Sequence, residues 1–222
     1  MAKFLVILVV VVAAGFVFAS FLGGGDDGAP IEAWRPRTVE AQLADLAACG
    51  ISLRPDRTVD ELFMSFARES YETSPTSLIV MLGSEVEAEP WGRRFSDDVW
   101  HFDTECIYDH GDYAEIARRM QTLAGGALPL EKIEDYVDLE EGVAWLELTL
   151  DGEAYHWDAR VEDDWVDPSI LSKLAKLLID RNQGVRFTYL DLGGQDCILG
   201  AATAEQLDCL RSKCGLGFVW LE

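Results

Sequence analysis

The segment AWLELTLDGEAYHWDARV, residues 144–161, constrains the fold more than any other part of the chain. Asp151-Gly152 is typical of a two-residue type I′ turn, because both of its positions need a positive φ that Asp and Gly tolerate. Apolar and polar residues alternate on either side of the turn, which is the period of a half-buried β-strand. We therefore expect an antiparallel hairpin in which Leu148 faces Tyr155.

This register divides the hairpin into two faces, because successive residues of a strand point to opposite sides of the sheet. The leucines between residues 146 and 150 lie on one face, which we expect to be buried. The other face is polar. It places His156 directly across from Glu147 and beside Asp158.

The remaining pattern alternates between helices and strands. Helical periodicity and capping residues predict helices over 38–48, 58–67, 76–83, 112–124, 167–181 and 203–214. Alternating or apolar runs predict strands over 100–108, 185–190, 197–201 and 217–221, while 130–138 fits either a helical turn or a strand. Hairpins mixed with helices indicate an α+β fold, with an antiparallel or mixed sheet and helices on one face.

The amino terminus carries an apolar run, FLVILVVVVAAGFVFASFL, from Phe4 to Leu22. Its length suits a helix that crosses the hydrocarbon core of a membrane. The run is either an uncleaved anchor or a signal peptide cleaved after Ala19, where Val-Phe-Ala resembles a cleavage site. Lys3 precedes it, so we expect the rest of the chain on the extracytoplasmic side, membrane-anchored through residues 4–22 or secreted if cleaved.

This reading gives four segments. Residues 1–22 are the transmembrane anchor or signal peptide, and residues 23–36, rich in Gly and Asp, are a flexible tether. A helical preface over 37–90 then precedes an α+β domain over 91–222, and we expect 37–222 to form one globular unit.

The chain is strongly acidic, with 40 Asp and Glu against 18 Lys and Arg and a net charge of −22. Between residues 131 and 167 the only basic residues are Lys132 and Arg160. Such a charge repels nucleic acid phosphates and attracts basic partners. We therefore expect no nucleic acid partner and consider a basic protein partner. Simple solubility explains the charge equally well.

The five cysteines have neither the CxxC nor the zinc-ligand spacing, and their odd number leaves at least one unpaired within the chain. We expect most of them to be small buried apolar residues. The sequence also lacks the GxSxG, HExxH, GxGxxG and Walker-type motifs. It therefore favours a protein without a cofactor and without catalytic activity.

A candidate metal site lies in the segment HFDTE, where alternation would put His101, Asp103 and Glu105 on one strand face. A His with two carboxylates is a ligand set for a divalent transition metal with open positions. If this strand lay beside the 144–161 hairpin, His156 and Asp158 could join the same site. An ordinary polar sheet face is the simpler explanation of both clusters.

The predicted order of elements over 112–190, with 130–138 as a strand, resembles the core of the restriction-endonuclease-like nucleases. The resemblance implies a (D/E)xK motif, whose nearest match is Asp158-Ala159-Arg160. Arg stands where the family has Lys, and the acidic charge argues against a DNA-binding enzyme.

The sequence as a whole leads us to expect a membrane-tethered extracytoplasmic domain that binds a basic protein, as inhibitor or immunity-type proteins do. One alternative is a metal-dependent hydrolase that uses the His/Asp/Glu strand-face site. Another is a structural subunit of an envelope complex.

Overall fold

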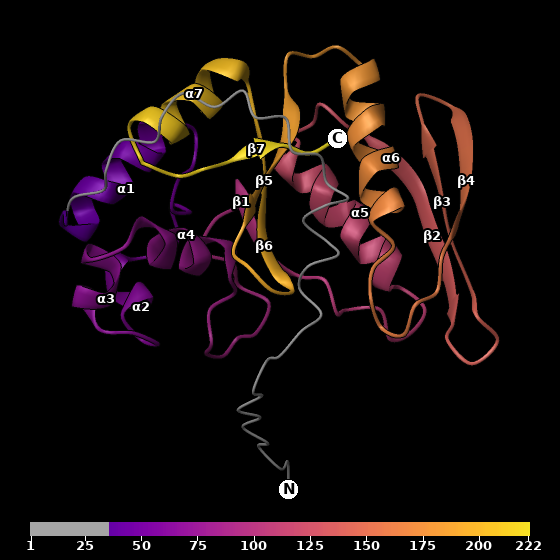
Figure 1. Ribbon diagram of the computed structural model, residues 1–222, viewed down its shortest axis with the longest axis horizontal. Helices are drawn as coiled ribbons and strands as arrows, with labels where there is room; N and C mark the ends of the chain where they lie inside the picture. The colour runs from indigo at the N-terminus through magenta and orange to yellow at the C-terminus, as the bar shows by residue number, and fades with distance from the viewer. Residues whose placement is uncertain (1–35) are drawn as a thin grey trace, which may run out of the picture.

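The computed structural model describes residues 36–222, which fold into two antiparallel sheets and seven helices (Figure 1). The first sheet has the strand order β1-β6-β5-β7, with β1 at Val99–Asp103, β5 at Arg186–Asp191, β6 at Asp196–Ala202 and β7 at Val219–Trp220. The second has the order β2-β3-β4, with β2 at Leu130–Asp138, β3 at Val143–Leu150 and β4 at Glu153–Ala159.

The helices form two layers. One layer consists of α1 (Val39–Ala48), α2 (Val59–Leu62), α3 (Arg68–Glu72), α4 (Pro75–Gly83) and α7 (Ala204–Ser212). The other consists of α5 (Asp112–Leu123) and α6 (Pro168–Asp180), which lie between the two sheets in Figure 1. The α+β class with antiparallel pairing is thus confirmed. The structure differs from the expectation in having two sheets, the first of which carries helices on both faces.

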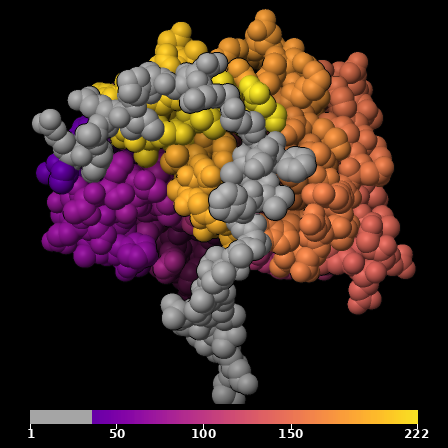
Figure 2. All heavy atoms as spheres, viewed as in Figure 1, coloured from indigo at the N-terminus to yellow at the C-terminus, as the bar shows by residue number. Residues whose placement is uncertain are grey.

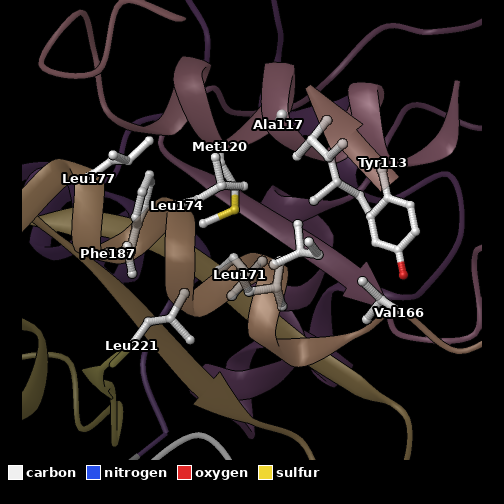
Figure 3. Packing of buried hydrophobic residues seen from close by; sticks show 14 of the residues in the cluster. Tyr113, Ala117, Met120, Val166, Leu171, Leu174, Leu177, Phe187 and Leu221 are labelled. Carbon is white, nitrogen blue, oxygen red and sulfur yellow. The ribbon is translucent and has the colours of Figure 1, made fainter. Parts of the chain in front are cut away.

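The first sheet is buried on both sides, and β6 shows how its sequence achieves this. Cys197 and Leu199 point into the core shared with α5 and α6, while Ile198 points into the core shared with α1, α4 and α7. The run DCILGAA is almost entirely apolar, as a strand with two covered faces requires. The core between the sheets is built largely from α5 and α6, where Met120 and Leu174 pack together with Phe187 of β5 (Figure 3).

The second sheet covers α5 and α6 with one face only. The predicted hairpin register is confirmed, with Leu148 opposite Tyr155 and Glu147 opposite His156. Asp151 and Gly152 both have positive φ, at 52° and 85°, as the predicted turn requires. Leu146, like its neighbours on the inner face, is buried, so the opposite face is left to solvent.

Several helix boundaries follow from the predicted caps. Asp167 caps α6 by accepting a hydrogen bond from the Ser169 backbone N–H, and Thr203 opens α7 with a capping box. The prediction of a helix over 58–67 is wrong in its length, because α2 ends at Leu62. Phe66, which lies beyond this end, is 58% exposed.

Two further segments differ from expectation or resolve an ambiguity. Residues 130–138 form a strand, β2, with an irregularity in its register between Glu131 and Glu134. The strand expected over 100–108 ends at Asp103. The likeness in element order to the nuclease core does not extend to the sheets, because β5 pairs with β6 and β7 and not with β2–β4.

A disulfide that no spacing in the sequence indicated joins Cys49, at the end of α1, to Cys209 in α7. Cys214 lies close by, with its Sγ 3.7 Å from the Sγ of Cys49. The bridge ties the helical segment after residue 37 to the carboxyl-terminal part of the chain, 160 residues away.

The predicted anchor at 4–22, the cleavage site after Ala19 and nearly all of the tether lie outside the described residues. Within residues 36–222, no helix combines the length and the apolar character needed to cross a membrane.

Candidate functional site: the outer face of the second sheet

The side chains that point away from α5 and α6 on the second sheet form a surface of aromatic rings and carboxylates. We call it the open face and define it by two residues of each strand: Glu134 and Tyr136 of β2, Trp145 and Glu147 of β3, and His156 and Asp158 of β4. Residues 130–160 form the outer margin of the molecule in Figures 1 and 2. A partner can therefore approach this face directly.

A row of aromatic rings crosses all three strands of the open face. The ring of Tyr136 stacks on that of Trp145, with centroids 6.1 Å apart and an angle of 16° between the planes. Trp145 continues the row to His156 at 5.4 Å. At the other end, His110 from the loop before α5 contacts Tyr136 at 4.5 Å. The Tyr136–Trp145 contact is stacked, whereas the contacts of His110 and His156 are tilted by 48° and 37°, so the row presents both ring faces and ring edges.

The loop and strand that carry His110 and Tyr136 are held together by a carboxylate on the inner face. Asp135 of β2 accepts hydrogen bonds from the backbone N–H groups of Gly111, Tyr113 and Ala114, at 2.7, 2.9 and 3.2 Å. These groups open the first turn of α5, where free N–H donors and the helix dipole favour a negative charge. Asp135 thereby fixes β2 against the start of the helix.

Two carboxylates hold the His156 ring. Its Nδ1 lies 2.7 Å from Glu147 Oε1, and its Nε2 lies 3.3 Å from Asp158 Oδ1. The hydrogen bond with Glu147 is the main reason that the pKa of His156 is raised, and the bond with Asp158 adds to it. Protonated His156 therefore neutralises part of the charge of the open face.

Two like charges also face each other on the open face, and only one of them is compensated. Glu134 and Glu147 are direct cross-strand partners in the β2–β3 ladder. Like charges placed directly opposite each other destabilise a sheet. Glu147 contacts His156, whereas Glu134 is exposed and makes no hydrogen bond or ion pair with any residue in 36–222. The face therefore presents excess negative charge beside its aromatic row.

The predicted metal-ligating residues are divided between the two sheets. His156 and Asp158 lie in β4, while His101 and Asp103 lie in β1, which pairs with β6. Helices α5 and α6 separate the two groups (Figure 1). The structure therefore does not bring the two predicted clusters together.

Strand β1 does not carry all three residues of the predicted His101 cluster. Because β1 ends at Asp103, the chain turns there, and the Glu105 backbone N–H donates to Asp103 Oδ1 at 2.9 Å. His101 instead lies 3.7 Å from Asp196 and 3.4 Å from the Ser84 hydroxyl. Among residues 36–222, no group of three His, Cys, Asp or Glu side chains is arranged to hold a metal ion.

The sequence did not predict the aromatic row, although it placed His156 on the polar face of the hairpin. The missing information was the assignment of 130–138. Once that segment is a strand paired with β3, Tyr136 lies opposite Trp145 and the row follows. The contribution of His110 depends on a loop position that no local pattern specifies.

No protein-family model, no characterised protein and no solved structure matches this chain.

Proposed function

We propose that this chain is a binding protein whose open face takes up a basic segment of another protein. The observation that carries the proposal is the position of Glu134 opposite Glu147, next to the rings of Tyr136 and Trp145. An Arg or Lys side chain placed there would separate the two carboxylates and lie over an aromatic ring. Both contacts favour a cation, the second by the cation–π interaction.

The composition of the whole chain supports the same class of partner. A net charge of −22 steers cationic surfaces toward the protein and repels anionic ones. Aromatic residues within a charged rim are also typical of protein interfaces, because rings bury a large area at a small cost in conformational entropy. The open face combines both features on one three-stranded sheet.

The proposed binding takes place at the outer side of a membrane. The apolar run over 4–22 would hold the domain at the membrane with residues 37–222 on the extracytoplasmic side, so the partner would be an exported or surface protein. The test is fractionation combined with added protease. A membrane-bound domain that protease digests in intact cells stripped of any outer barrier supports this location, and a protected domain contradicts it.

Binding is tested with the purified full-length chain and a labelled peptide that contains alternating Arg and Lys. We expect saturable binding that weakens steeply as salt rises, because screening reduces the attraction between the charges. A peptide of the same length with Glu in place of Arg and Lys serves as the control and should not bind. Equal binding of the two peptides, or affinity insensitive to salt, would contradict the proposal.

A further inference from the structure

A second polar site lies on a different part of the molecule, at the free edge of β1. It is a pocket of about 240 Å³ between the end of α4 and the side of α5. Trp100 and His101 of β1 form one wall, and Arg94 and Arg119 contribute guanidinium groups. The exposed carboxylates Glu85 and Glu115 stand at its rim.

Arg119 is the unusual residue in this pocket, because its side chain is only 4% exposed and only partly paired. Its Nη2 donates to the Val99 carbonyl at 2.8 Å and to the Ser96 carbonyl at 3.3 Å. Its Nε and Nη1 have no hydrogen-bond partner among residues 36–222. A buried donor without a partner is costly, and a charged one more so.

The carboxylate that forms an ion pair with Arg119 also pairs with other arginines. A single carboxylate, Asp97, forms ion pairs with Arg54, with Arg94 at 3.1 Å and with Arg119 at 3.8 Å. Burial, followed by the nearby positive charge of Arg94, lowers the pKa of Arg119 to about 10. Arg119 therefore stays protonated at neutral pH. The carboxylate with which it forms an ion pair also pairs with two other arginines.

The acids at the rim attract Arg119 electrostatically, but within residues 36–222 neither of them forms an ion pair with it. Glu115 is directed to Arg118, at 3.9 Å, and its side chain is 71% exposed. Glu85 is exposed, and its residue pairs through the backbone with Arg94. Inside the pocket, His101 adds a ring nitrogen that lies 3.4 Å from the Ser84 hydroxyl.

We propose that this pocket binds a small oxyanion, the carboxylate or phosphate group of a small molecule, with the free donors of Arg119 at its base and Arg94 and His101 at its wall. Charge-assisted hydrogen bonds to a buried guanidinium are among the strongest available to such a group. Trp100 would cover the rest of the molecule. The site is independent of the proposed function, since it lies at another sheet and selects the opposite charge.

The direct test observes the Arg119 side-chain N–H signals by nuclear magnetic resonance in the isotopically labelled full-length protein. Inorganic phosphate and acetate are titrated separately, with chloride at the same ionic strength as the control. We expect a saturable shift of the Arg119 Nε–H signal with at least one oxyanion and no such shift with chloride. Absence of a saturable shift with both oxyanions, or an equal shift with chloride, would overturn the proposal.

Variants separate this pocket from general surface charge. Arg94→Gln and Arg119→Lys should each weaken oxyanion binding about tenfold or more, because each removes or misplaces a charge-assisted donor. Arg160→Gln, which removes an exposed Arg just after β4 and outside the pocket, is the matched control and should leave affinity unchanged. If Arg119→Lys does not fold, the Arg94→Gln variant and the wild-type titration still test the proposal. Equal weakening by Arg160→Gln would overturn the proposal.

Discussion

Single residues stabilise this fold through contacts with near neighbours in the sequence and through contacts with distant ones. The cap at Asp167 and the contact of His156 with Glu147 follow from spacings of a few residues around a turn or a helix start. The capping of α5 by Asp135 joins residues 21 to 24 positions apart. No local pattern specifies such a contact, because it depends on how β2 packs against the helix.

His156 makes the stability of the fold depend on pH. Its folded-state pKa is raised by Glu147 and Asp158, so the protonated ring stabilises the folded state. This contribution is complete below the unfolded pKa of about 6.5 and is lost as the pH rises through the higher folded value. We expect His156→Gln to remove it, which is measured as the difference in unfolding free energy between wild type and variant across this range. A difference that does not change with pH contradicts the prediction.

The same titration should affect binding in the opposite direction. Loss of the proton from His156 makes the open face more negative, so affinity for the Arg/Lys peptide should increase as the pH rises through the folded pKa of His156. Peptide titrations at several pH values, with His156→Gln as the control, measure this. Affinity that falls with rising pH in the wild type would count against the open face as the binding surface.

Asp135 provides a prediction on stability alone. Asp135→Ala leaves three N–H groups at the start of α5 without their acceptor and should lower the free energy of unfolding by about 1–3 kcal/mol. Chemical denaturation measures the loss. Glu134→Ala, which changes the neighbouring residue of the same strand on the exposed face, is the control and should cost much less.

At the scale of elements, alternation and turn chemistry were sufficient to predict the 143–159 hairpin and to locate the strands β5 and β6. They were insufficient for β2, whose sequence fits two periods, and for α2 and α3, which are too short to show one. The division of the strands into two sheets was not predictable, because no local sequence pattern specifies which distant strands pair. For that reason the two predicted metal-ligand clusters could be located individually but not relative to each other.

The pairing of β2 with β3 gives a prediction about Glu134. If repulsion from Glu147 destabilises the sheet, Glu134→Gln should raise the free energy of unfolding by about 0.2–1 kcal/mol. The gain should shrink at high salt, where exposed charges are screened. Thermal and chemical denaturation at low and high salt measure both effects. A variant less stable than wild type at low salt contradicts the repulsion.

At the scale of the whole molecule, the disulfide between Cys49 and Cys209 closes a long loop that includes the strands β1 to β6. Closing a loop of this length restricts the unfolded chain, so replacing both cysteines by Ser should lower the free energy of unfolding by about 2–4 kcal/mol. Reduction of the wild type should have a similar effect. A double variant as stable as the oxidised wild type would show that the bridge contributes nothing to stability.

Attraction by net charge and binding at the open face predict different contributions from individual acidic residues. If only net charge attracts a basic partner, any two acidic residues contribute equally. If the open face is the binding surface, Glu134 and Glu147 contribute far more than acids elsewhere. Glu69, in α3, and Glu89, in the loop before β1, are exposed and distant from the second sheet, so they form a matched pair for comparison.

The most direct test measures the affinity of the full-length chain for the Arg/Lys peptide in two double variants of identical net charge. Glu134→Gln with Glu147→Gln should weaken binding about tenfold or more, since both carboxylates and their position beside Trp145 are lost. Glu69→Gln with Glu89→Gln should leave affinity close to that of the wild type. Equal loss of affinity in the two variants, or none in the first, would contradict binding of the peptide at the open face.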